Sequence, residues 1–301
     1  MSRALALLPN RVAAGGRAAR VVPQVVAELD RLAADYRIIE AGSLEAARTF
    51  ARAAGADGET VVAIGGDGLV GPVAGALRGT PGALAIVPAG RGNDFARVLG
   101  VPTNPREAAV LAAQGAERLL DVAEANGHPF IGIASLGFDS DANRIANESR
   151  LVRGNAVYLY AALRALASWR PARFEVTVDG ERATVSGYTV AVANSKAYGG
   201  GMYLVPHAEL DDGLFDVLLI GKKSKLAFLR DVPKVFRGAH VDDPAARFMR
   251  GAEVEVRADR PFTVYADGDP IADLPLRATI ERRSLRVITP APAGAAAPPA
   301  P

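Results

Sequence analysis

The residues best suited to chemistry in this chain are glycines and carboxylates grouped in short loops. Gly65, Gly66, Asp67 and Gly68 directly follow an apolar run at residues 61–64. Glycine lets the backbone come close to a ligand, so its N–H groups can hold phosphate oxygens. Asp67 adds a carboxylate that suits Mg²⁺ binding or proton transfer. The alternative interpretation is a tight glycine turn with a capping carboxylate.

A second glycine loop follows the apolar run at residues 85–88 and contains Gly90, Arg91, Gly92 and Asn93. Its glycines again allow close backbone approach, Arg91 can bind a phosphate, and Asn93 can cap a helix. Two such loops at the carboxyl ends of nearby strands are typical of the nucleotide crevice in an open α/β sheet. The pair therefore favours nucleotide binding over two unrelated turns.

Two acidic loops lie in the second half of the chain, at residues 211–213 (Asp-Asp-Gly) and 267–269 (Asp-Gly-Asp). Asp and Gly both tolerate the backbone angles of tight turns. On their own, these patterns indicate β-turns, and nothing in either tripeptide demands catalysis.

The elements that position the glycine loops alternate strand and helix over residues 1–120. We predict strands at residues 5–8, 36–39, 61–64 and 85–88, and helices at 17–34, 44–54, 69–78, 93–99 and 105–114. This alternation implies a three-layer α/β domain with helices on both faces of a parallel sheet. Pro23 moves the expected start of the first helix to near Val22, and Pro72 is expected in the first turn of the third.

From residue 119 the pattern changes to short strands and Asn-Gly or Asp-Gly turns. Strands are predicted at residues 119–123, 129–134, 173–178, 183–194, 214–220, 253–258, 262–266 and 278–289. We therefore expect a β-rich second domain, a sandwich, at residues 121–278. Residues 279–290 would complete the first domain, and the Ala/Pro-rich residues 291–301 would form a disordered tail.

Two helices are expected to interrupt the second domain. Residues 157–169, which end at the single tryptophan, are expected to pack in the core; the alternative is the floor or gate of a lipid pocket. Residues 224–237 place Lys225, Arg230, Lys234 and Arg237 beside apolar residues. That pattern suits either an interfacial helix or an ordinary solvated helix face.

The composition narrows the class of protein. A formal net charge of +2, from 35 basic and 33 acidic residues, does not indicate nucleic-acid binding. The absence of cysteine excludes disulfides and thiolate metal sites and fits a reducing cytoplasm. No run approaches the ~20 apolar residues of a membrane-spanning helix, so membrane contact is expected to be peripheral, at the inner face.

The order of the glycine loops resembles that of a known family. Gly-Gly-Asp-Gly at residues 65–68 precedes Pro-x-Gly-x-x-Asn-Asp-Phe-Ala-Arg at residues 88–97. This pair is similar to motifs of the diacylglycerol kinase catalytic domain family, which includes bacterial diacylglycerol kinases and sphingosine kinases. The resemblance extends from residue 5 to about residue 288. It implies a kinase with ATP as co-substrate and a requirement for Mg²⁺.

The resemblance also implies which residues bind ATP. The nucleotide would contact Asn10, Arg11, Ala14, Gly65, Gly66, Asp67, Gly68, Gly90, Arg91, Gly92 and Asn93. The chain departs from the family pattern in three places. Pro9-Asn10 is inverted, residues 69–72 (Leu-Val-Gly-Pro) replace Thr-Leu-Asn-Glu, and Arg91 replaces a small or hydroxyl residue. We expect the charge of Arg91 to compensate for the hydrogen bonds that Leu69 cannot make, which the KM of Arg91→Ala for ATP would test.

The acidic loops acquire roles through the same resemblance. Asp212 and the carbonyl groups of Glu209 and Leu214 match a structural Mg²⁺ site, and Asp121 matches a residue that joins Asp67 and this loop through water. The catalytic residues implied are Asp267, Asp269 and Asp67. The first would take the proton from the acceptor hydroxyl, the second would assist it, and the third would help to place the metal. Asn194 falls in a further family-like segment that is expected to shape the cleft between the domains.

The resemblance therefore implies an ATP-dependent lipid kinase that converts diacylglycerol to phosphatidic acid at a membrane surface. The alternatives are a kinase of another lipid, such as a sphingoid base or monoacylglycerol, and a kinase of a soluble acceptor such as NAD. A third is a catalytically silent regulator that binds lipid or nucleotide, which the altered residues 69–72 favour and the retained aspartates oppose. A strand edge in the second domain could also pair two copies of the chain as a homodimer.

Overall fold

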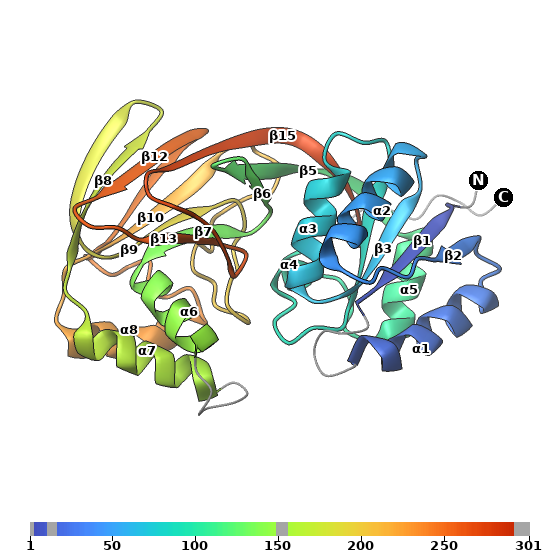
Figure 1. The fold of residues 1–301 in the computed structure, drawn as a ribbon, viewed down its shortest axis with the longest axis horizontal. Helices are drawn as coiled ribbons and strands as arrows, with labels where there is room; N and C mark the ends of the chain where they lie inside the picture. The colour runs from blue at the N-terminus through green and yellow to red at the C-terminus, as the bar shows by residue number, and fades with distance from the viewer. Residues whose placement is uncertain (1–2, 11–16, 149–155, 292–301) are drawn as a thin grey trace. The chain divides into compact units, whose positions relative to one another are not determined.

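The computed structural model describes residues 3–10, 17–148 and 156–291 and divides into two compact units (Figure 1). Unit 1 comprises residues 1–120 and 283–301, and unit 2 comprises residues 121–282. The chain passes from one unit to the other within strand β5 (Ala116–Ala125) and within strand β15 (Leu276–Thr289). Among the described residues, no helix is both long and apolar enough to cross a membrane.

Unit 1 is built on a parallel sheet. Its strands are β1 (Leu5–Pro9), β2 (Tyr36–Ile38), β3 (Thr60–Gly65) and β4 (Ala83–Pro88), in the order β4-β3-β1-β2. The end of β15 pairs with β4, also in parallel. Strands β1, β3 and β4 are buried at every residue, as expected where helices cover both faces of a parallel sheet. The predicted α/β fold of this part of the chain is confirmed.

The helices of unit 1 are α1 (Arg17–Arg31), α2 (Leu44–Ala56), α3 (Asp67–Leu77), α4 (Asp94–Val98) and α5 (Pro105–Gln114). Helix α1 packs against α5, and α2 packs against α3. The Ser43 hydroxyl caps α2 by accepting a hydrogen bond from the Ala46 N–H at 3.1 Å. That hydroxyl satisfies one of the backbone donors that a helix N-terminus leaves unpaired.

Two expectations about proline are wrong. Helix α1 begins at Arg17 rather than near Val22, so Pro23 lies inside it. The buried apolar face of α1 outweighs the one backbone hydrogen bond that proline removes. Helix α3 begins at Asp67 rather than at residue 69, which places Pro72 beyond its first turn. The consequence for the site is that Asp67 itself belongs to the first turn of a helix.

Unit 2 is an antiparallel β-rich body. Its strands are β6 (His128–Phe130), β7 (Ile133–Gly137), β8 (Ala172–Val178), β9 (Glu181–Ala193), β10 (Phe215–Gly221), β11 (Ala246–Gly251), β12 (Glu253–Ala258), β13 (Thr263–Ala266) and β14 (Asp269–Asp273). They follow the order β14-β13-β7-β9-β8-β12-β15, with β10 between β9 and β11. The β-rich character is confirmed, but β11 and β14 were not expected, and the predicted strand at 129–134 is broken at residues 131–132.

Three helices accompany these strands: α6 (Phe138–Glu148), α7 (Ala156–Ser168) and α8 (Lys225–Val235). The first was not predicted, so the expectation of two helices is corrected to three in the described part of unit 2. Trp169, just after α7, is buried and lies against Tyr188 and Phe138, with ring centroids 6.0 Å and 5.7 Å away. It packs in the core, as expected.

Candidate functional site

The two glycine loops of unit 1 touch each other. Gly66 follows β3, and Gly90 follows the neighbouring strand β4. A Cβ atom added to Gly66 would lie only 2.8 Å from the Gly90 Cα atom, so neither position has room for a side chain. The Ala89 N–H also donates to the Gly65 carbonyl at 2.8 Å. The parallel sheet thus brings both loops to the carboxyl ends of β3 and β4, where open α/β sheets bind ligands.

The second loop is held in shape by Asn93. This residue has left-handed backbone angles, with φ of 53°, and its side chain does not cap α4. Instead its Oδ1 atom accepts the Gly90 N–H at 2.9 Å, and its Nδ2 atom donates to the Gly90 carbonyl at 3.2 Å. Arg17 donates to the same carbonyl at 2.8 Å. Arg91 is exposed at the tip of the loop, where its guanidinium can meet an anion.

Asp67 connects the two loops. Its Oδ1 atom accepts the N–H of Phe95, at the start of α4, at 3.3 Å. A Cβ atom on Gly68 would meet nothing within 4 Å, so the backbone beside Asp67 faces open space. The first turn of an α-helix carries partial positive charge and favours phosphate groups.

The third predicted nucleotide loop is only partly described. Asn10 donates its backbone N–H to the Ile64 carbonyl at 3.0 Å, and its Cβ atom lies 3.4 Å from where a side chain on Gly65 would begin. Asn10 therefore lies beside the first glycine loop. Arg11 and Ala14 lie outside the described residues.

In unit 2, Asp267 has a carboxylate held by backbone donors. The residue has a left-handed conformation, with φ of 51°. Its Oδ2 and Oδ1 atoms accept the N–H groups of Ile131 and Gly132 at 3.0 Å and 2.8 Å. Any side chain at residue 132 would collide with the carboxylate. Asp269, by contrast, is exposed at the start of β14.

Asn194 links Asp267 to the other acidic positions. It is fully buried directly after β9, and its N–H donates to the Gly132 carbonyl at 2.9 Å. Its Nδ2 atom donates to the carbonyls of Ile131 and Asp121, at 3.0 Å and 3.4 Å. Sequence reasoning assigned Asn194 only to the cleft. Asn194 is the last residue of the strand predicted at 183–194, and no local signal in the sequence marks its linking role.

Asp121 continues this network to the loop at residues 209–214. Its N–H donates to the Leu210 carbonyl at 2.7 Å, and its Oδ2 atom accepts the Gly213 N–H at 2.6 Å. Three acidic positions far apart in the sequence, Asp121, Asp212 and Asp267, therefore belong to one hydrogen-bonded region of unit 2. The chemical roles that the resemblance implies for these residues stay predictions.

Asp212 has a backbone N–H group and an arginine as partners. Asp212 accepts the Leu214 N–H at 2.9 Å and pairs with Arg250. Arg250 also lies 3.7 Å from Asp216, a buried carboxylate whose Oδ2 atom has no partner among the described residues. Burial raises the pKa of Asp216, and the Arg250 charge acts against this rise. No three His, Asp or Glu side chains within the described ranges converge as metal ligands, so a Mg²⁺ ion here would also need carbonyl oxygens.

Another carboxylate, Asp139, lies at the start of α6. Its Oδ1 atom accepts a hydrogen bond from the Thr189 hydroxyl at 3.2 Å. Burial raises the pKa of Asp139 to about 6, and the hydroxyls of Thr189 and Ser135 oppose this rise. A raised pKa means that the folded chain holds the proton more tightly than the unfolded chain. The stability of the fold should therefore fall as the pH rises from about 4 to about 6.

We predict that Asp139→Asn raises the melting temperature at pH 8 and changes it little at pH 3.5. The amide keeps an oxygen for the Thr189 hydroxyl and removes the desolvated charge. At pH 8 the free energy of unfolding should rise by about 1–3 kcal/mol. Each kcal/mol corresponds to a rise of roughly 2–4 °C in melting temperature. Calorimetry at the two pH values measures it. An equal gain at both would mean that the amide improves packing or hydrogen bonding instead.

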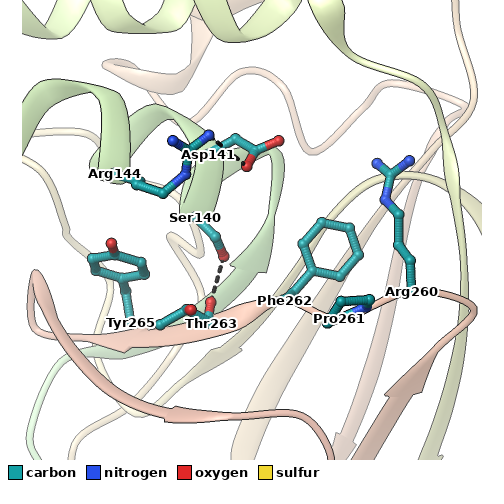
Figure 2. A pocket seen from close by; sticks show the side chains of 8 residues that line it. All are labelled: Ser140, Asp141, Arg144, Arg260, Pro261, Phe262, Thr263 and Tyr265. Carbon is teal, nitrogen blue, oxygen red and sulfur yellow. Dashed lines mark hydrogen bonds and ion pairs between the residues drawn. The ribbon is translucent and has the colours of Figure 1, made fainter. Parts of the chain in front are cut away.

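A polar pocket of about 200 Å³ lies close to the Asp267 loop along the chain (Figure 2). Its lining residues are Ser140, Asp141, Arg144, Arg260, Pro261, Phe262, Thr263 and Tyr265. The Ser140 hydroxyl donates to the Thr263 carbonyl at 2.7 Å and so joins α6 to β13. The pocket is smaller than the roughly 300–1,000 Å³ of drug-sized ligand sites, and it combines two arginines with one aspartate. Its size and polarity suit a small polar group.

Two family descriptions match most of the chain. Residues 4–125 match the Diacylglycerol kinase catalytic domain, and residues 132–289 match the YegS C-terminal NAD kinase beta sandwich-like domain. The first covers the glycine loops and Asp121. The second covers Asn194, the loop at residues 209–214 and Asp267.

Curated relatives agree with these matches. A protein of Mycobacterium tuberculosis named Diacylglycerol kinase is 35% identical over 291 residues, covering 94% of each chain. A Bacillus subtilis protein of the same name is 28% identical over 77% of this chain and 78% of its own length. A Pseudomonas aeruginosa protein named Probable lipid kinase YegS-like is 32% identical over 82% of this chain and 82% of its own length. A solved diacylglycerol kinase of Bacillus anthracis shares the fold, with a TM-score of 0.75, 22% identity and 97% coverage of both chains.

Proposed function

The chain belongs to the diacylglycerol kinase family, and from this premise we propose that it transfers the γ-phosphoryl group of ATP to the hydroxyl group of a lipid. The observation that carries the proposal is the backbone contact between Gly66 and Gly90 at the ends of two parallel strands. This contact requires glycine at both positions and brings the two loops together, with open space beside Gly68 in the first turn of α3. Kinase catalysis depends mainly on positioning and charge neutralisation, which a helix N-terminus facing open space can supply.

On the nucleotide side, the phosphates would lie against the two glycine loops. The N-terminus of α3 and the guanidinium of Arg91 would attract their negative charge. Asp67 would help to hold the nucleotide's Mg²⁺, because carboxylates are preferred ligands of this ion. When bound, Mg²⁺ would neutralise charge on the phosphate oxygens. A structural Mg²⁺ would fit beside Asp212, with Asp216 as a nearby carboxylate and backbone carbonyls completing the oxygen donors.

On the acceptor side, Asp267 would act as the general base. It would accept the hydroxyl proton as the acceptor oxygen bonds to the γ-phosphorus and the bond to the β-phosphate oxygen breaks, releasing ADP. The backbone donors of Ile131 and Gly132 fix the orientation of its carboxylate. The polar pocket beside Tyr265 would receive the polar end of the acceptor.

We propose diacylglycerol as the acceptor and phosphatidic acid as the product. The names of the relatives from Mycobacterium tuberculosis and Bacillus subtilis favour this acceptor. A second candidate is a soluble acceptor such as NAD, because the matched C-terminal family is described as NAD kinase-like and the pocket near Asp267 is polar. A different lipid would keep the same mechanism with another headgroup.

The test is phosphoryl transfer from γ-labelled ATP in the presence of Mg²⁺. Purified protein would be incubated with mixed micelles that each carry one lipid, and in parallel with NAD in solution. We expect label in phosphatidic acid. Label in another lipid would correct the acceptor, and label in NADP would favour the second candidate. ATP binding without transfer to any acceptor would contradict kinase activity and favour the silent regulator.

A further inference from the structure

Helix α8 exposes an apolar face that no other part of its unit covers. Leu226, Leu229 and Phe236 are 78%, 37% and 49% exposed. Residues spaced by three, four or seven positions share one side of a helix, so Leu226, Leu229 and Pro233 form one stripe that Phe236, just past the end of α8, extends. The opposite side of the helix is anchored in unit 2 through Phe228, whose ring stacks on Tyr188 with centroids 4.2 Å apart.

The charge beside this stripe has one sign. Residues 222–237 contain six basic residues and one acidic residue, a net charge of +5. The acidic residue, Asp231, is buried and bonds to Lys223 and Lys234, each at 2.8 Å. On the exposed side, Arg230 follows Leu229 and lies 4.0 Å from the buried Asp231 carboxylate, and Arg237 follows the exposed Phe236. The outer face of α8 is therefore both apolar and cationic.

Helix α7 meets α8 at one point. Lys225 donates to the carbonyl of Ala167, near the end of α7, at 2.7 Å. Leu163 of α7 is 44% exposed, and Arg164 beside it is also exposed. Apolar and basic residues thus occur together on both helices.

We propose that the outer face of α8 docks on the surface of an anionic phospholipid bilayer. Apolar side chains flanked by lysine and arginine match the layering of such a surface, where acyl chains lie beneath acidic headgroups. A protein partner would need its own acidic and apolar patch, whereas the bilayer offers both everywhere. The inference deepens the proposed function, because a kinase of membrane lipids must reach its acceptor at this surface.

Vesicle sedimentation without ATP tests the docking directly. The intact chain should bind vesicles that contain phosphatidylglycerol and should bind vesicles of phosphatidylcholine alone far more weakly. Each cation near an anionic surface contributes roughly fivefold in binding, so Arg230→Glu/Arg237→Glu should weaken binding by at least about 30-fold. Leu226→Ser/Leu229→Ser should remove the part of the binding that persists at high salt.

The matched control is Arg173→Glu/Arg257→Glu, which makes the same charge change at exposed positions on β8 and β12. This variant should bind anionic vesicles nearly as well as the unaltered chain. The proposal is overturned if the α8 variants bind like the control, if the unaltered chain binds no vesicles, or if it binds neutral vesicles equally well. An absence of vesicle binding would favour a protein partner for this face.

Activity on a short-chain, water-soluble acceptor separates the docking from the catalysis. The α8 variants should phosphorylate that acceptor at the unaltered rate, while losing activity on acceptors embedded in vesicles. If the unaltered chain binds anionic vesicles through α8 but phosphorylates no acceptor, the docking stands and the proposed kinase function fails. If it phosphorylates the soluble acceptor without binding vesicles, the proposed kinase function stands and the docking proposal fails.

Discussion

Gly90→Ala should raise the KM for ATP by about 10²-fold, because misplacing binding groups by ~1 Å can cost that much. A Cβ atom at this position would lie 2.8 Å from the Asn93 Oδ1 atom and closer still to the Gly66 Cα atom. Backbone atoms cannot swing aside as a long side chain can, so the two glycine loops must separate. The hydrogen bonds that Asn93 and Arg17 make to Gly90 would be strained at the same time.

The fold should also lose stability in this variant, since overpacking costs about 1–3 kcal/mol. Gly82→Ala separates that loss from the effect on the nucleotide. A Cβ atom at Gly82, immediately before β4, would lie 2.6 Å from the Gly55 Cα atom and 2.6 Å from the Glu59 carbonyl oxygen. The clash is similar but falls at the opposite end of the same strand.

We therefore expect similar losses of melting temperature in the two variants and a raised KM for ATP only in Gly90→Ala. Steady-state kinetics and calorimetry on both proteins provide the comparison. If both variants raised the KM alike, the effect would come from general destabilisation. If Gly90→Ala bound ATP normally, the glycine loops would not be the nucleotide site.

The two glycine loops proposed to bind the nucleotide were largely predictable as strand-and-turn units, because these depend on local sequence. An apolar run that ends in glycine predicts a buried strand and a turn, and two such units in succession predict neighbouring parallel strands. The contact between Gly66 and Gly90 was not predictable. It depends on the register of β3 against β4, in which Gly65 lies opposite Pro88.

The roles of the acidic loops were harder to predict because Asp-Gly turns look alike in sequence. Asp179-Gly180 and Asp267-Gly268 both have positive φ at both residues. In both turns the carboxylate accepts two successive backbone N–H groups, those of Ala252 and Glu253 for Asp179. Only the surroundings differ. Asp267 joins a network that contains Asn194 and Asp121, and tertiary contacts of this kind leave no local trace in the sequence.

Helix α6 shows the other limit of sequence reasoning. Residues 138–148 contain two Asp, two Asn and one Ser, which favour turns and caps over helix interiors. Tertiary contacts override this propensity: the Ser140 hydroxyl bonds to β13, and Phe138 packs on Trp169 and Phe228. The pocket beside the Asp267 loop therefore depends on an element that the local pattern opposes.

Asp267→Asn should lower kcat by about 10²–10⁴-fold, the usual contribution of a general base. The amide cannot accept the proton of the acceptor hydroxyl at neutral pH. The KM for ATP should stay unchanged, because the proposed nucleotide loops lie in unit 1 and Asp267 lies in unit 2. Single-turnover transfer from labelled ATP measures the chemical step.

This substitution also has a structural cost. Both oxygens of Asp267 accept backbone N–H groups, and the introduced amide nitrogen would face one of these donors. A backbone N–H that faces another donor and finds no acceptor lowers the free energy of unfolding by about 1–3 kcal/mol. A loss of activity alone would therefore not distinguish catalysis from a disturbed turn.

Asp179→Asn is the matched control, because its carboxylate occupies the same kind of turn in the same unit. Its Oδ1 atom accepts the N–H groups of Ala252 and Glu253 at 3.1 Å and 2.8 Å, and a side chain on Gly251 would collide with its Oδ2 atom just as one on Gly132 would collide with Asp267. Asp179→Asn should lose no more stability than Asp267→Asn, and only Asp267→Asn should lose phosphoryl transfer. Equal loss of activity in both would falsify the general-base assignment, since the turn and not the proton acceptor would then be what the reaction needs. Full activity in both would place the base elsewhere, with Asp269, exposed two residues further along, the next carboxylate to substitute.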